Sequence, residues 1–312
     1  MTSDILYKYN NGNLVVTLYK NGTKVTLVNG DEMSPSFPDN IDVLITRCCS
    51  QNCPFCYENC TPNGQHAILF NSDGSPQWNW MNHLHAGQEL ALNGNDLDHP
   101  QLESFLKFLR KQDVVPNITI NQNQFMSNID KIKYYVDNEL VFGVGVSFLK
   151  QDDKFIEEFS KLKNGVIHTI AGVTSIEDYK WLGKFNLKIL ILGYKDRGRG
   201  SLYKSSHNVK FNKLIYFLYD ILNGVRSDLS YDVISFDNLA LTQLDIKKNF
   251  FSDKPDKWDT MYQGNDGLRT FYIDLVEGKF AKDSTSYNDV YYDINDLTTD
   301  EMLNFLKNNS NA

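Results

Sequence analysis

The chain has 312 residues, 41% of them hydrophobic and 13% aromatic, so it can bury a sizeable core and is too apolar for a disordered or fibrous protein. Its 31 Lys and Arg are outnumbered by 39 Asp and Glu, and this charge of −8 argues against duplex nucleic acid as a partner. No apolar run approaches the ~20 residues that cross a bilayer, and the N-terminus does not resemble a signal peptide, so we expect a cytoplasmic protein without membrane contact.

Residues 1–38 predict a small antiparallel β-meander. Alternating polar and apolar residues are interrupted at Asn11-Gly12 and at Asn21-Gly22. Asn-Gly readily adopts the positive φ angles of a tight hairpin turn, so both sites indicate hairpins. We expect the meander to end near Pro38.

Residues 39–249 predict an α/β fold built from alternating strands and helices. Short apolar runs occur at residues 41–46, 88–94, 117–121, 141–148, 165–172 and 187–194. Amphipathic helical patterns separate several of them, as at residues 100–112, 154–163 and 175–185. This alternation predicts a partial parallel (β/α)6 barrel of the TIM type, which residues 233–244 would close. Residues 250–312 are expected to form a C-terminal extension that caps the barrel.

All five cysteines lie between Cys48 and Cys60, directly after the first predicted barrel strand. Ligands of parallel β/α folds bind at the C-terminal ends of the strands, so this segment occupies a position where chemistry is expected. A disulfide framework is disfavoured because the number of thiols is odd and there is no signal peptide.

Two interpretations of the cysteine segment stay open on spacing alone. A structural zinc site in a non-catalytic binding protein would draw on Cys49, Cys53, Cys56 and Cys60, or recruit His66. Zinc modules usually combine two ligand pairs, and a second C-x2-C pair is missing here. Alternatively, the C-x3-C-x2-C spacing of Cys49, Cys53 and Cys56 suits three corners of an iron–sulfur cube and leaves one iron open.

The segment "CSQNCPFC", with Phe55 before the third cysteine, resembles the cysteine motif of the radical S-adenosylmethionine (radical SAM) superfamily. A second match follows in "QELALNGNDLDHPQLESFLKFLRKQ". There Asn93, Gly94 and Asn95 occupy the positions of the family's Gly-Gly-Glu motif, and "LDHPQL" follows in register. The two asparagines depart from the family pattern. The similar organisation covers roughly residues 40–200.

The resemblance implies a 4Fe–4S cluster held by Cys49, Cys53 and Cys56, with SAM on the open iron. It also implies that SAM is reductively cleaved to methionine and a 5′-deoxyadenosyl radical. That radical would abstract hydrogen from a small-molecule or peptide substrate, with an electron donor such as flavodoxin or ferredoxin as partner. Because no cysteine follows Cys60, the resemblance does not extend to relatives with auxiliary all-cysteine clusters.

The family pattern also assigns residues to SAM itself. It places Phe55 near the adenine, and Asn93, Gly94 and Asn95 at the amino group. Asn121 and Ser147 end two predicted strands where relatives contact SAM. The last two residues could equally be ordinary polar groups at strand ends.

Catalytic candidates follow the predicted strand at residues 187–194. Lys195, Arg197 and Arg199 could meet a carboxylate or phosphate on SAM or substrate, or form a solvated basic loop. Cys60 could donate a hydrogen atom near the site or be an inert thiol. Asp237 and Asn238 could line the substrate end of the barrel or cap a helix. His168, flanked by apolar residues, is interpreted as a core histidine with a satisfied hydrogen bond.

Overall fold

The computed structural model describes residues 4–93, 96–207, 209–285 and 290–309. The N-terminal meander is confirmed as an antiparallel sheet of β1 (Ile5–Asn11), β2 (Leu14–Tyr19) and β3 (Lys24–Val28). Gly12 turns the chain between β1 and β2 at a φ of +61°, and a Cβ there would lie 1.9 Å from the carbonyl oxygen of Ser34. Glycine is therefore required at this turn by both conformation and space.

The six predicted barrel strands are all present and pair in parallel, in chain order. They are β4 (Asn40–Leu44), β5 (Glu89–Asn93), β6 (Val115–Asn121), β7 (Gly143–Ser147), β8 (Gly165–Ile170) and β9 (Leu187–Leu192). A further strand, β10 (Tyr231–Phe236), pairs in parallel with β9. The predicted α/β fold with a partial parallel barrel is thus confirmed.

The C-terminal segment, expected as a cap, also supplies strands to the large sheet. Strand β11 (Thr270–Asp274) pairs in parallel with β4, on the side away from β5. Antiparallel β12 (Lys279–Ala281) and β13 (Tyr292–Asp293) continue from it. Within the described residues the sheet order is β10-β9-β8-β7-β6-β5-β4-β11-β12-β13. Residues far apart in sequence therefore meet at β4, directly before the cysteine segment.

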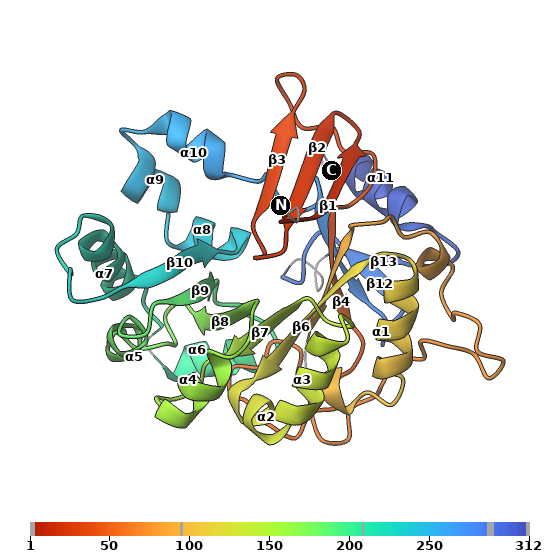
Figure 1. Cartoon of the computed structure of the whole chain (residues 1–312), viewed down its shortest axis with the longest axis horizontal. Helices are drawn as coiled ribbons and strands as arrows, with labels where there is room; N and C mark the ends of the chain where they lie inside the picture. The colour runs from red at the N-terminus through yellow and green to blue at the C-terminus, as the bar shows by residue number, and fades with distance from the viewer. Residues whose placement is uncertain (1–3, 94–95, 208, 286–289, 310–312) are drawn as a thin grey trace.

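The helices mostly follow the strands and cover the outside of the curved sheet, except for a lobe at residues 246–261 that stands apart from it (Figure 1). They are α1 (Leu102–Lys111), α2 (Gln122–Ser127), α3 (Ile129–Asp137), α4 (Asp153–Phe159), α5 (Ile176–Leu182), α6 (Arg199–Ser206), α7 (Asn212–Leu222), α8 (Asn238–Gln243), α9 (Ile246–Phe251), α10 (Pro255–Met261) and α11 (Thr299–Asn309), with 3-10 turns η1 (Asn79–Asn82) and η2 (Asp96–Asp98). Helix α1 buries Leu102, Phe105, Leu106 and Leu109, the spacing of one helix face. Among the described residues, no helix has both the length and the apolar character needed to cross a bilayer.

The parallel sheet curves so that its inner face encloses a cavity. In β9, Ile189 and Ile191 belong to the buried core, whereas Leu190 and Leu192 line the cavity. Phe236 of β10 and Thr270 of β11 come from opposite edges of the parallel part of the sheet and line the same cavity. The alternation along each strand thus provides a core side and a ligand side.

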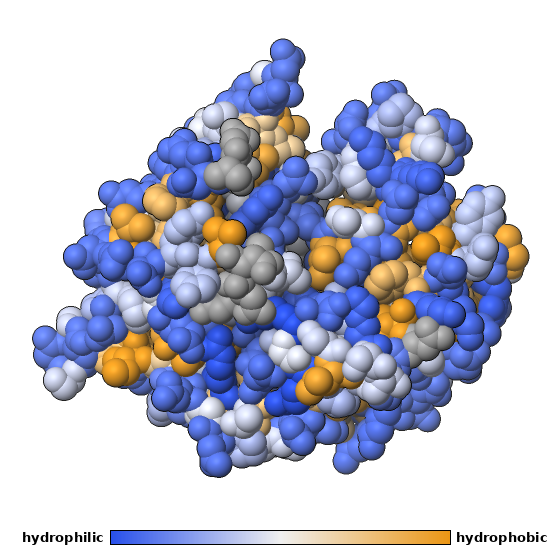
Figure 2. Space-filling view, turned by 180° about the vertical axis from the view of Figure 1, so that it is seen from behind, coloured by the Kyte–Doolittle hydropathy of each residue, from blue (hydrophilic) through white to orange (hydrophobic). Residues whose placement is uncertain are grey.

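The meander closes the barrel at the N-terminal ends of the strands, away from the cysteine segment (Figure 1). Lys24 donates to Glu89, the first residue of β5, at 2.5 Å and lies 3.8 Å from Asp39. Arg269 forms a buried ion pair with Asp39, and Lys188 donates to the carbonyl of Asn21 at 2.8 Å. From behind, a notch separates the meander from the α9–α10 lobe (Figure 2).

Candidate functional site

The curved sheet encloses a cavity of about 520 Å3 that extends from the first residues of β4 and β11 to the C-terminal ends of β5, β6 and β7. Seven residues predicted to bind the cluster or SAM line it: Cys49, Cys53, Cys56, Phe55, Asn93, Asn121 and Ser147. They come from the cysteine segment and from the ends of β5, β6 and β7. Gly94 and Asn95, also predicted to contact SAM, lie outside the described residues.

The cysteine segment folds back on itself through backbone hydrogen bonds. The amide of Cys49 donates to the carbonyl of Thr61 at 2.8 Å, and the amide of Thr61 donates to the carbonyl of Arg47 at 3.0 Å. At Gly64 a Cβ would lie 1.9 Å from the Arg47 carbonyl oxygen, so only glycine lets the two arms approach. His66, an alternative zinc ligand, has its Nδ1 2.8 Å from the Thr46 hydroxyl.

Hydrogen-bond donors face the sulfurs of the three predicted ligands. The amide of Gln51 donates to Cys49 Sγ at 3.5 Å, and Asn121 Nδ2 donates to Cys53 Sγ at 3.7 Å. A hydrogen bond from the Cys60 thiol lowers the pKa of Cys56 to about 6, and the same bond raises the pKa of Cys60. Such donors stabilise thiolates, the form in which cysteine binds metals.

The donor set fits a 4Fe–4S cluster. Among the described residues, no group of three or more His, Cys, Asp and Glu side chains is placed to hold one metal ion. A cubane takes one thiolate at each of three irons, so its ligands surround a space instead of meeting at one ion. Cys49, Cys53 and Cys56 all face the same large cavity, as this arrangement requires.

The loop after β9 packs closely against the cysteine segment. Arg199 donates from Nε to the carbonyl of Cys53 at 3.0 Å and from Nη1 to that of Cys60 at 2.9 Å. Its Nη2 is buried and has no hydrogen-bond partner among the described residues. At Gly198, with a φ of +55°, a Cβ would lie 2.5 Å from the Tyr57 carbonyl oxygen. The loop thus brings a guanidinium to the cavity beside the thiols.

The predicted catalytic residues divide into two groups. Lys195 lines the cavity with its Nζ 3.9 Å from the centre of the Tyr57 ring, and Cys60, 5% exposed, lines it as well. Arg197 does not line it. Its guanidinium is buried, lies 3.4 Å from Glu58 and donates to the carbonyl of Ser284. The structure therefore brings Lys195 and Cys60 to the cavity and places Arg197 in a buried ionic network with Glu58.

The buried ionic network around Glu58 was not apparent from the sequence. Glu58 is paired with Arg47 and Arg197, each at 3.4 Å, and accepts a hydrogen bond of 2.9 Å from the Tyr272 hydroxyl. Arg47 also pairs with the fully buried Asp274. Because Tyr272 and Asp274 belong to β11, the network ties the cysteine segment to the C-terminal part of the chain. Nothing local in the sequence signals contacts over such separations.

Carboxylates from separate elements also line the cavity. Asp237 caps α8 by accepting from the amide of Ala240 at 2.7 Å, and it lines the cavity as well, so both alternatives for this residue hold. Asn238 lines the cavity and donates to Asp266 at 2.7 Å. Asp42 of β4 is a third cavity carboxylate. Asp42 and Asp266 were not predicted as site residues, although a charged residue inside the apolar run of β4 is a usable signal in the sequence.

His168 does not fit its interpretation as a core histidine with a satisfied hydrogen bond. It lines the cavity, and its buried Nδ1 has no hydrogen-bond partner within the described part of the chain. Burial lowers the pKa of His168 to about 4, so the imidazole is neutral at pH 7. The ring lies across Gly145, where a Cβ would be 2.3 Å from it.

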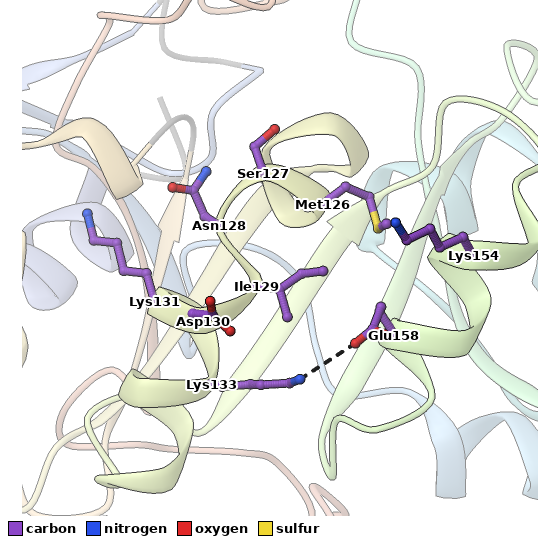
Figure 3. A pocket seen from close by; sticks show the side chains of 9 residues that line it. All are labelled: Met126, Ser127, Asn128, Ile129, Asp130, Lys131, Lys133, Lys154 and Glu158. Carbon is purple, nitrogen blue, oxygen red and sulfur yellow. Dashed lines mark ion pairs between the residues drawn. The ribbon is translucent and has the colours of Figure 1, made fainter.

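A different hollow, of about 610 Å3, lies on the outside of the barrel between α2, α3 and α4. Figure 3 shows its side chains, including the ion pair between Lys133 and Glu158 at 3.5 Å. None of the predicted site residues lines this hollow. We therefore assign the candidate site to the barrel cavity.

No family model matches the sequence, and no curated protein matches it at a significant level. Among solved structures, the fold is similar to that of SuiB from Streptococcus suis. The crystal structure of SuiB bound to S-adenosylmethionine has a TM-score of 0.53 and 13% identity, covering 90% of this chain and 82% of that chain. A second SuiB crystal structure has a TM-score of 0.53 and 12% identity, with the same coverage of both chains. This likeness confirms the fold that the radical SAM resemblance predicted.

Proposed function

We propose that this protein is a radical SAM enzyme. It would hold a 4Fe–4S cluster through Cys49, Cys53 and Cys56 and bind SAM beside it in the barrel cavity. The observation that carries the proposal is that these three thiols and the polar strand ends of β5–β7 face one cavity of about 520 Å3. The likeness in fold to SuiB, whose structure was determined with SAM bound, supports it.

The bound pair would supply one-electron reductive cleavage of SAM and hydrogen abstraction from a substrate, with the electron coming from a donor such as flavodoxin or ferredoxin. The chain's own part is binding and orientation. Asn93, Asn121 and Ser147 offer amide and hydroxyl groups to the amino, carboxylate and ribose groups of SAM, and Phe55 offers a face for the adenine. The assignment of Gly94 and Asn95 to the amino group rests on the resemblance.

The chain also supplies charge and shelter from water. Arg199 lines the cavity, and its buried Nη2 has no hydrogen-bond partner among the described residues, so we assign this guanidinium to the carboxylate of SAM. Leu149, Ile170, Leu190 and Leu192 give the inner wall an apolar character. Excluding water strengthens electrostatic contacts and prevents side reactions of a reactive intermediate.

SAM binding can be tested through one strand-end hydroxyl. Ser147→Ala removes a hydrogen bond to a charged or polar group of SAM, so we expect the Kd for SAM to rise about tenfold. Ser50→Ala is the matched control, because Ser50 is exposed and does not line the cavity. Calorimetric titration of the reconstituted protein measures both. Equal affinities of the two variants would remove Ser147 from the SAM site.

Cys60 is expected to tune the cluster without holding it. Cys60→Ala removes the hydrogen bond that the Cys60 thiol donates to Cys56. Such a hydrogen bond stabilises the reduced cluster, because the reduced cluster carries more negative charge. We expect four irons to remain and the reduction potential to fall by about 40 mV, the equivalent of about 1 kcal/mol for a one-electron step. Cys60→Ser restores a donor, and Cys48→Ala is the control. An unchanged potential in Cys60→Ala would show that this hydrogen bond is absent from the loaded protein.

The test of the function itself is SAM cleavage. Anaerobically reconstituted protein, given dithionite and SAM, is expected to release 5′-deoxyadenosine, measured by liquid chromatography and mass spectrometry. The same protein without cluster provides the background. Protein that carries about four irons yet releases no 5′-deoxyadenosine above that background would contradict the proposal.

A further inference from the structure

Three carboxylates, Asp42, Asp237 and Asp266, form what we call the acidic wall of the cavity. Resting on the proposed function, we propose that the acidic wall binds a positively charged amine or guanidinium group of the substrate. The three residues come from β4, from the start of α8 and from the segment between α10 and β11. The start of α8 contacts the segment before β11 through Asn238 and Asp266, and β11 pairs with β4.

Two of the three carboxylates, Asp237 and Asp266, are held in place by hydrogen bonds. Asp237 accepts from the amides of Gly193 and Ala240 at 2.9 and 2.7 Å. Asp266 accepts from Asn238 at 2.7 Å and from the Thr270 hydroxyl at 3.4 Å. Such bonds fix the direction of the carboxylates before any ligand arrives, which lowers the entropic cost of binding.

The acidic wall carries more negative charge than its surroundings balance. Burial raises the pKa of Asp42 to about 6, Lys195 opposes this shift, and Asp266 and Asp237 add to it. Burial likewise raises the pKa of Asp237 and of Asp266, with Lys195 opposing the shift only at Asp237. Lys195 thus opposes the shift at only two of the three carboxylates, Asp42 and Asp237. Buried like charges are unfavourable unless a cation joins them, and a substrate amine would supply that cation.

Among the described residues, Arg199 is the cavity cation assigned to the carboxylate of SAM, and the other cations near the cavity are already engaged. Arg269 lines the cavity, but its guanidinium forms the buried ion pair with Asp39. Burial lowers the pKa of Lys195, yet Tyr57, Asp237 and Asp42 outweigh this and raise it overall, so its charge is held by the same wall. Arg197 is buried beside Glu58. An anionic substrate would therefore meet repulsion from the acidic wall without free cations to offset it.

A second observation points to a ligand in this cavity independently of the carboxylates. The buried Nδ1 of His168 has no hydrogen-bond partner among the described residues, although the side chain lines the same cavity. Buried polar atoms in folded proteins are almost always paired, because an unpaired one costs free energy. A ligand with a polar group that reaches Nδ1 would pair this atom, and a charged amine would neutralise the acidic wall.

The experiment measures binding of simple charged probes to reconstituted protein in the presence of saturating SAM, so that SAM itself does not compete. Putrescine and agmatine are the cationic probes, glutarate is the anionic one, and Mg2+ tests for an ordinary cation site. Thermal unfolding reports binding. Asp42→Asn and Asp266→Asn alter the wall. Asp253→Asn removes the same charge at a side chain that is 73% exposed and outside the cavity.

We expect putrescine or agmatine to raise the Tm of the wild type and of Asp253→Asn, and glutarate and Mg2+ to leave it unchanged. Asp42→Asn and Asp266→Asn are each expected to weaken amine binding at least about tenfold. Without a probe, both variants should unfold at a higher temperature than the wild type, because repulsion is relieved. Folding failure would appear as a lower Tm and would itself contradict this expectation.

The proposal is overturned if glutarate or Mg2+ stabilises the protein as well as the amines do, if neither amine binds, or if amine binding survives in both wall variants. The same samples are assayed for 5′-deoxyadenosine. Cleavage of SAM without amine binding overturns the amine site and leaves the radical SAM function standing. Amine binding without cleavage supports the acidic wall and removes the proposed function.

Discussion

Replacing Cys53 with alanine is expected to abolish cluster binding, with iron falling from about four per chain to near zero. The same result is expected for Cys49→Ala and Cys56→Ala, because each thiolate would hold a separate iron and the three side chains face one cavity. Release of 5′-deoxyadenosine should fall to background in all three. Iron and sulfide analysis after anaerobic reconstitution measures the loss.

Cys48→Ala is the matched control for these variants. Cys48 lies next to Cys49 in the chain, but it does not line the cavity, and its thiol donates to the carbonyl of Pro62 at 3.4 Å. Its replacement should leave the iron content unchanged. If Cys60→Ala lost the cluster while Cys49→Ala kept it, the assignment of the three ligands would be wrong.

Replacing Glu58 with alanine is expected to destabilise the protein by about 3–5 kcal/mol, the usual cost of removing one member of a buried ion pair. The change takes away the carboxylate that balances Arg197 and Arg47 and the acceptor of the Tyr272 hydroxyl. Because this network joins the cysteine segment to β11, cluster incorporation should fall as well. Urea denaturation of the cluster-free protein measures the free energy of unfolding.

Glu277→Ala provides the comparison for Glu58→Ala. Glu277 also pairs with Arg47, at 3.5 Å, but its side chain is 52% exposed. Water screens such a pair, so its loss should change the free energy of unfolding by less than about 1 kcal/mol. Equal effects of the two substitutions would mean that the Glu58 network does not stabilise the fold as described.

Much of the fold could be predicted because its signals are local. Strands β4 to β9 are short apolar runs separated by amphipathic helical patterns, and the Asn-Gly turns define the meander. The place of β11 could not be predicted in this way. Its apolar run resembles any other strand, and its residues pair with residues of β4 that precede them by 230 positions, as Thr270 does with Asn40. Pairing over that separation depends on the whole fold.

The candidate site could likewise be predicted only where its signals are local. The cysteines and the strand-end residues Asn93, Asn121 and Ser147 follow from motif and strand order, and they line one cavity. Arg197 looked equivalent to Lys195 because both follow β9, yet the loop turns Arg197 toward Glu58. His168 looked like a core residue because its neighbours are apolar, yet its side chain lines the cavity.

The measurement that tests the central claim most directly is made on anaerobically purified and reconstituted protein. Iron, sulfide and zinc contents are determined, and electron paramagnetic resonance spectra of the reduced protein are recorded with and without SAM. We predict about four irons and four sulfides per chain, with a spectrum that SAM perturbs because it binds the open iron. One tightly held zinc, with no response to SAM, would contradict the account and make the cysteine segment a structural zinc site.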